Sequence, residues 1–140
     1  MKLFKYLVAL LLLGSLSSYS FAQSYSVIVH PSNNADFDAD IVKRIFLAKQ
    51  KTFSDGKRAF PANIKPPSDK RDAFQDKILH KSDNQVRTYW AMLVFSGKAI
   101  PAKLVETEEQ MLDLVAHNPG VIGYVSANSV NDRVKAVLEF

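Results

Sequence analysis

Hydrophobic residues between positions 23 and 140 fall into short β-branched runs and longer stretches with helical spacing. The short runs predict strands, and repeats of three to four residues predict amphipathic helices. The predicted strands are 25–30, 58–64, 121–125 and 134–140, and the predicted helices are 36–47, 68–79, 82–97 and 107–117. Because helices separate the strands, the pattern predicts one α/β domain built in layers.

Polar residues mark where several of these elements begin. Ser68 is an expected N-cap, and the Ser82–Gln85 and Thr107–Gln110 segments have the capping-box pattern. Pro61 interrupts the second strand, which predicts that this strand lies at a sheet edge. The last strand is also predicted to lie at an edge. The predicted core of the sheet comprises Val27, Val29, Val121, Ile122 and Val125.

The first 22 residues have the pattern of a secretory signal peptide, Met1–Ala22. Lys2 and Lys5 give a positive start, and Leu7–Leu13 is an apolar run too short to span a bilayer. Small residues precede Gln23, which predicts that the signal peptide is cleaved immediately before Gln23. The sequence therefore predicts a domain at 23–140 that is periplasmic and not stably inserted in a membrane. The alternative is an uncleaved N-terminal anchor.

Composition and charge exclude several classes of protein and of binding partner. The sequence has no cysteine, which excludes disulfide scaffolds, thiol catalysis and thiolate metal sites. Residues 43–103 hold 14 basic and five acidic residues, whereas both flanking segments are net acidic. This asymmetry indicates an anion-facing surface, although ordinary solvated faces would give the same pattern. Nucleic acid is not an expected partner, because the net charge is small and no basic recognition helix is present.

Enzymatic activity is not expected. His30, His80 and His117 lie about 40 to 50 residues apart, and none has metal-ligand spacing. The sequence contains no nucleophile elbow, Walker phosphate loop or dinucleotide fingerprint. The glutamates of segment 106–109 suit a helix dipole and do not form a paired acid and base. No catalytic residue, metal or cofactor is therefore expected.

The candidate ligand-binding residues are Ser68, Asp69, Lys70 and Arg71. A helix start presents unpaired backbone N–H groups and the positive end of the dipole, which favour an anion. Ser68 can cap the helix and still offer its hydroxyl. Lys70 and Arg71 add positive charge where the dipole disfavours it, which costs stability unless an anion binds. The alternative is that both side chains extend into solvent or pair with Asp69 and Asp72.

Five stretches of sequence occur in an informative order. They are VIVHPSN (Val27–Asn33), IVKRIFLAKQKTFSDG (Ile41–Gly56), SDKRDAF (Ser68–Phe74), YWAMLVFSGKAIP (Tyr89–Pro101) and NPGVIGYV (Asn118–Val125). Together they resemble the short, stand-alone branch of the phosphate ABC transporter substrate-binding proteins. The resemblance implies a single lobe of the type II periplasmic-binding-protein fold, with a mixed β-sheet and flanking helices. It also implies phosphate or a similar oxyanion as ligand, and a transporter or another periplasmic protein as a further partner.

The resemblance carries over to the candidate site only in part. In two-lobed members a Ser-Gly-Thr turn opens a helix and binds phosphate. Ser68 matches the serine, whereas Asp69 replaces the glycine and Lys70 replaces the threonine. An arginine is expected four residues before the serine, but Ile64 stands there with Lys65 beside it. The carboxylate of Asp69 would repel an anion.

Two functions are left open by the sequence. The first is an exported solute-binding-like protein that binds phosphate or a similar oxyanion weakly at the Ser68 helix start. The second is a structural or protein-interaction module that keeps the lobe and has lost ligand capture. If Lys70 and Arg71 serve only an anion, replacing both with alanine should leave the stability unchanged or slightly raised.

Overall fold

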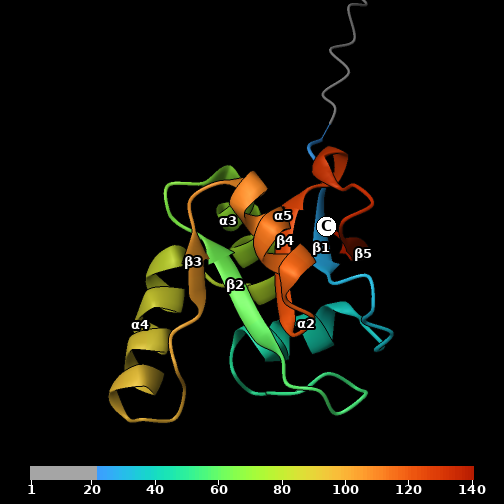
Figure 1. The fold of residues 1–140 in the computed structure, drawn as a ribbon. Helices are drawn as coiled ribbons and strands as arrows, with labels where there is room; N and C mark the ends of the chain where they lie inside the picture. Colours follow the sequence, from blue (N-terminus) through green and yellow to red (C-terminus); the bar gives the residue numbers. More distant parts are fainter. Residues whose placement is uncertain (1–21) are drawn as a thin grey trace, which may run out of the picture.

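Five strands form one sheet in the order β3-β2-β4-β1-β5 (Figure 1) in this computed structural model, which describes residues 22–140. β2 is parallel to β3 and β4, whereas β1 is antiparallel to β4 and β5. This mixed sheet confirms the predicted α/β fold class. The signal peptide predicted over residues 1–22 lies, except for its last residue, outside the described residues. The strands are β1 (Tyr25–Val29), β2 (Phe60–Ile64), β3 (Lys103–Val105), β4 (Val121–Ser126) and β5 (Lys135–Glu139).

Four α-helices connect the strands, and each begins at a side-chain cap, as the polar pattern indicates. α3 continues directly into a π-helical segment, η1 (Gln75–Leu79), and a short 3-10 turn, η2 (Ala127–Ser129), follows β4. At Ser82 the complete capping box forms with Gln85. The helices are α2 (Ala39–Phe46), α3 (Asp69–Phe74), α4 (Asp83–Phe95) and α5 (Glu108–His117), with N-caps Asp38, Ser68, Ser82 and Thr107.

The core lies on both faces of the sheet. α2 and α3 cover one face and α5 covers the other (Figure 1). Phe46 of α2, Phe74 of α3 and Tyr124 of β4 pack ring against ring on the first face. On the second face a side chain at Gly123 would collide with the Met111 side chain of α5, so a larger residue at this strand position would force Met111 to shift. The five predicted core residues of the sheet are all buried.

The position of the second strand was predicted wrongly. β2 lies inside the sheet, and the three-residue strand β3, which the sequence pattern did not reveal, forms the edge. Phe60 donates its N–H to Gly120 on the β4 side at 2.8 Å, so the position of Pro61 faces the β3 side. Pairing with β3 begins only at Ala62. The missing N–H of Pro61 therefore costs no ladder bond, and an interior strand tolerates the proline.

α4 is attached to the domain near its start and exposes its end. Val86 is its one buried residue, and the Tyr89 hydroxyl donates to the Leu47 carbonyl at 2.6 Å. Further along, Met92 is largely exposed and Phe95 is 96% exposed. None of the helices within residues 22–140 has the length and apolar character needed to cross a bilayer.

Candidate functional site

The parallel strands β2 and β3 lead into α3 and α5 at one end of the sheet, the upper end in Figure 1. A hollow of about 490 Å³ lies between these two helix starts. Three of the four predicted binding residues, Ser68, Asp69 and Lys70, line it. We call it the carboxyl-end hollow, and it is lined by Ile64, Pro67, Ser68, Asp69, Lys70, Glu106, Thr107, Glu108 and Glu109.

Both helix starts at the hollow are capped by their own first residues. Ser68 Oγ accepts the Arg71 N–H at 3.2 Å, and Thr107 Oγ1 accepts the Gln110 N–H at 3.1 Å. Earlier amides of each first turn have no helical carbonyl to bind. Parallel pairing of β2 with β3 thus brings a second positive helix end to the one that the sequence identified.

Arg71 does not line the hollow, and its surroundings differ from those expected from the sequence. Its side chain is neither in solvent nor paired with Asp69 or Asp72, since the residue is only 7% exposed. Arg71 Nη1 donates to the Ile64 carbonyl at 3.1 Å, and Nε donates to Asp83 Oδ1 at 3.4 Å. The guanidinium therefore joins β2 to the start of α4, because its planar donors reach both acceptors.

Asp83 is partly exposed and contacts three donor side chains. Gln75 Nε2 donates to Asp83 Oδ1 at 3.2 Å, beside the Arg71 bond. The Gln75 hydrogen bond and the nearby Arg71 charge outweigh partial burial, so the pKa of the Asp83 carboxyl is lowered. Arg87 contacts the other carboxylate oxygen at 3.2 Å. The cluster acts as a structural clamp between α3, η1 and α4.

Four carboxylates line the hollow, and three of them have donors. Lys65 Nζ pairs with Glu106 at 3.0 Å, and Arg133 pairs with Glu109 at 2.8 Å. The carboxylate of Glu108 accepts hydrogen bonds from the Ser126 amide and the Ser129 hydroxyl, which joins α5 to the end of β4 and to η2. Sequence reasoning assigned these glutamates to the helix dipole and missed that they meet Asp69 in space.

Negative charge near the hollow also acts on the neighbouring Tyr25. Burial raises the pKa of its hydroxyl, and the carboxylates of Asp69 and Glu108 raise it further. The same potential opposes binding of an anion. The helix starts and Lys70 therefore favour an oxyanion, whereas the carboxylates disfavour it.

Tyr124 fixes the strand end beneath the hollow. Its hydroxyl accepts the Ile64 N–H at 3.2 Å and donates to Asn63 Oδ1 at 3.2 Å. Burial raises the pKa of Tyr124 to about 12, so the hydroxyl stays protonated. The N–H and carbonyl of Ile64 are thus both held by side chains, from Tyr124 and Arg71. Tyr124 therefore packs in the core and also holds the end of β2.

His30 and His117 form contacts with residues close to them in the sequence. His30 Nδ1 lies 2.7 Å from Ser32 Oγ, and His117 Nδ1 lies 2.8 Å from the Asp113 carbonyl. No group of three or more His, Cys, Asp or Glu side chains that could hold a metal ion occurs within residues 22–140.

Solved structures share this fold over 82% of the chain. One, assigned as a phosphate ABC transporter substrate-binding protein from Clostridium perfringens with bound phosphate, is 22% identical with a TM-score of 0.67. An ABC-type phosphate transport receptor from Vibrio cholerae is 17% identical with a TM-score of 0.64. PstS from Borrelia burgdorferi is 11% identical with a TM-score of 0.62. No family model matches the chain, and no curated protein matches it.

The matched proteins are much longer than this chain. The chain spans 44%, 45% and 46% of these three proteins, less than half of each. At such low identity the likeness concerns the fold alone. The chain therefore has the fold of a single lobe of a phosphate ABC transporter substrate-binding protein.

Proposed function

We propose that this chain is an exported solute-binding-like lobe that binds phosphate or a similar oxyanion weakly, and that it is not an enzyme. The observation that carries the proposal is the meeting of two helix starts, those of α3 and α5, at the carboxyl-end hollow. Their unpaired amides and the Lys70 ammonium would contact the anion. The Clostridium perfringens structure of the same fold holds phosphate, which supports this ligand class.

Weak affinity follows from two features of the hollow. The carboxylate of Asp69 forms no ion pair within residues 22–140 and would repel the anion. An anion bound to this lobe alone also keeps one side in water, where charge-assisted bonds lose much of their strength. We therefore expect a dissociation constant in the millimolar range, equivalent to about −4 kcal/mol.

The experiment is calorimetric titration of the mature protein with phosphate, sulfate and arsenate at low and physiological salt. Millimolar binding of phosphate that weakens as salt increases would support the proposal, because exposed charges are screened beyond about 8–10 Å at physiological ionic strength. Micromolar binding by a monomer would contradict it, since that affinity needs a second surface around the anion.

Replacing Asp69 with asparagine should strengthen phosphate binding about fivefold. The substitution removes one negative charge beside the anion and nearly preserves side-chain shape, a gain of about 1 kcal/mol in water. Asp76 on η1 is exposed and does not line the hollow, so Asp76→Asn is the matched control. Calorimetry should show the gain in the first variant only. An equal change in both, or none in Asp69→Asn, would rule out this position for the anion.

Export is the second part of the proposal. We expect a signal peptidase to remove Met1–Ala22, leaving Gln23 as the first residue of a periplasmic protein. Mass spectrometry and N-terminal sequencing of the protein recovered from the periplasmic fraction should identify Gln23, free or cyclised. Recovery of a chain that retains Met1 in the membrane fraction would favour the uncleaved anchor.

A second candidate function is supported by the same hollow. The Arg71 guanidinium already binds the Ile64 carbonyl and the Asp83 carboxylate, and four carboxylates lie around the two helix starts. On this hypothesis the chain keeps the lobe, has lost ligand capture and acts through contacts with a transporter or another periplasmic protein. Absence of phosphate heat in both the wild type and Asp69→Asn would favour this second function over the first.

A further inference from the structure

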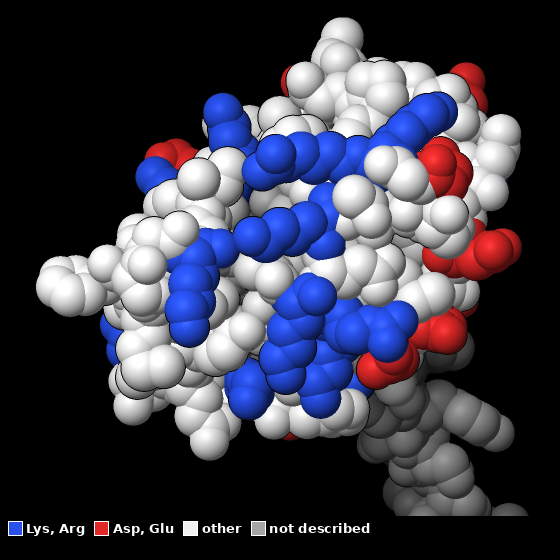
Figure 2. All heavy atoms as spheres, turned by 90° about the horizontal axis from the view of Figure 1, so that it is seen from below, with Lys and Arg blue, Asp and Glu red and all other residues white. Residues whose placement is uncertain are grey.

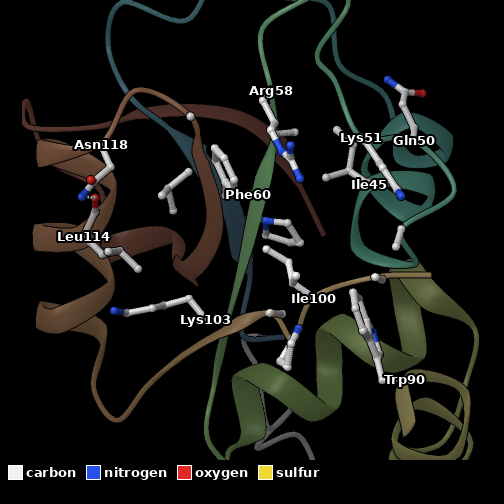
Figure 3. A pocket seen from close by; sticks show the side chains of 18 of the residues that line it. Ile45, Gln50, Lys51, Arg58, Phe60, Trp90, Ile100, Lys103, Leu114 and Asn118 are labelled. Carbon is white, nitrogen blue, oxygen red and sulfur yellow. Dashed lines mark hydrogen bonds between the residues drawn. The ribbon is translucent and has the colours of Figure 1, made fainter. Parts of the chain in front are cut away.

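A larger pocket lies at the opposite end of the sheet from the carboxyl-end hollow. The amino ends of the three parallel strands meet there, with Phe60 starting β2, Lys103 starting β3 and Val121 starting β4. The pocket has a volume of about 720 Å³, within the range of about 300–1,000 Å³ that accommodates small organic ligands. We call it the amino-end pocket; Figure 3 shows the side chains around it.

Apolar side chains form much of the pocket lining. Phe60, Trp90, Ile100 and Leu114 come from β2, α4, the α4–β3 connection and α5 (Figure 3). Phe60 is 42% exposed and Ile100 is 66% exposed, although large apolar side chains gain free energy by leaving water. Contiguous exposed apolar groups of this kind commonly mark a binding site.

Positive charge surrounds this apolar lining. Lys51, Arg58, Lys98 and Lys103 line the pocket, and none of its lining residues is acidic. Within residues 22–140 none of these four cations forms an ion pair. Figure 2 shows lysine and arginine side chains gathered over this end of the molecule, with the acidic residues towards its margin.

Two contacts hold cations at the pocket. The Arg58 guanidinium lies over the Phe60 ring, with its central carbon 5.4 Å from the ring centroid. Lys51 Nζ donates to the Lys98 carbonyl at 3.1 Å, which bridges the segment before β2 to the segment after α4. Cations are therefore positioned beside an apolar cavity, and their mutual repulsion is relieved when an anion binds.

We propose that the amino-end pocket binds an organic anion with an apolar body, such as a medium-chain carboxylate. The apolar body would cover Phe60, Trp90 and Ile100, and the anionic head would contact Lys103, Lys98 or Arg58. Inorganic phosphate lacks the apolar part and would leave that surface in water. The pocket and the carboxyl-end hollow lie at opposite ends of β2, so this inference does not depend on phosphate binding.

Trp90 provides a direct measurement, because it is the sole tryptophan of the sequence and lines the pocket. The mature protein is titrated with sodium decanoate below its micelle-forming concentration, and Trp90 emission is recorded. Decanol and inorganic phosphate are the comparison ligands. We expect a saturable change with decanoate, at least tenfold weaker binding of decanol, and no change with phosphate. Equal binding of decanol and decanoate, or no saturable change, would overturn the proposal.

Charge reversal tests the role of the cations. Lys103→Glu should weaken decanoate binding about tenfold, whereas Lys77→Glu changes the net charge equally on an exposed η1 residue outside the pocket and should have no effect. Arg58→Gln provides a second loss of charge if Lys103→Glu disturbs β3, and far-UV circular dichroism checks the fold. Equal weakening in Lys77→Glu would mean that only net charge matters.

Anionic phospholipid vesicles test whether the pocket binds a lipid surface. A change in Trp90 emission with these vesicles but not with decanoate would indicate a lipid surface as the partner and would also refute the proposal.

Discussion

Replacing Phe74 with alanine should lower the free energy of unfolding by about 3–5 kcal/mol, the usual cost of emptying a fully buried phenylalanine position. Phe74 is 0% exposed. Its ring stacks on Tyr124 at a centroid distance of 4.4 Å and an interplanar angle of 8°. It also meets Phe46 at 4.5 Å and Phe140 at 5.5 Å. Loss of this one ring therefore removes contacts to α2, β4 and the chain end together.

Phe95 provides the matched control for that substitution. It is the same residue type, on α4, and is 96% exposed, so Phe95→Ala should change stability by less than about 0.5 kcal/mol. Urea denaturation followed by circular dichroism measures both variants. A loss below about 1 kcal/mol in Phe74→Ala would mean that the aromatic cluster does not form the core described above.

Replacing Arg71 with alanine should cost about 1–3 kcal/mol, the range for hydrogen bonds to charged groups and for buried partners left unpaired. The substitution leaves the Ile64 carbonyl and Asp83 without their guanidinium donor. Water can still reach Asp83, whose side chain is partly exposed, which keeps the cost below that of a fully buried pair. Lys70→Ala in the same turn should cost much less, because the Lys70 ammonium forms no ion pair within residues 22–140.

This expectation replaces the one that the sequence supported, in which loss of Lys70 and Arg71 together left stability unchanged. Urea denaturation of the two single variants separates the outcomes. Equal and small losses would mean that the Arg71 clamp contributes nothing, whereas a large loss for Arg71→Ala alone would support it.

The pH dependence of Arg71→Ala gives a further test of the same clamp. The folded-state pKa of Asp83 is lowered, first by the Gln75 hydrogen bond and then by Arg71. A carboxyl with a lowered folded pKa stabilises the protein above its unfolded pKa, near 4, and this contribution is lost as the pH falls through the folded value. The stability difference between wild type and Arg71→Ala should therefore shrink from pH 5 towards pH 2. A constant difference would exclude the Asp83 contribution.

The candidate site shows where local reasoning is sufficient. Ser68 was predicted as an N-cap, and its hydroxyl accepts the Arg71 N–H as expected. The Ser82 capping box also forms. Both bonds join residues three positions apart, so the neighbouring sequence decides them.

At Thr107 only one of the two hydrogen bonds of the predicted capping box forms. The Thr107 hydroxyl accepts the Gln110 N–H, but the Gln110 side chain accepts the Glu106 N–H at 2.8 Å. The reciprocal bond to Thr107 that defines the full capping box is therefore replaced by one to the preceding residue. The helix start was predicted correctly, whereas the partner of Gln110 depended on how the chain leaves β3.

The sequence by itself determined four of the five strands, the four helices, the caps Ser68, Ser82 and Thr107, and the buried valines and isoleucine of the sheet. Each of these depends on apolar periodicity or on contacts within one helical turn. Only the tertiary structure decided the strand order, which placed Pro61 in an interior strand, and the direction of Arg71, whose partner Asp83 lies 12 residues away. It also brought Glu106, Glu108 and Glu109 to Asp69 and four cations to one apolar pocket. These groups meet because β2 pairs in parallel with β3 and β4, and such pairing between distant segments leaves no spacing in the sequence from which it could be predicted.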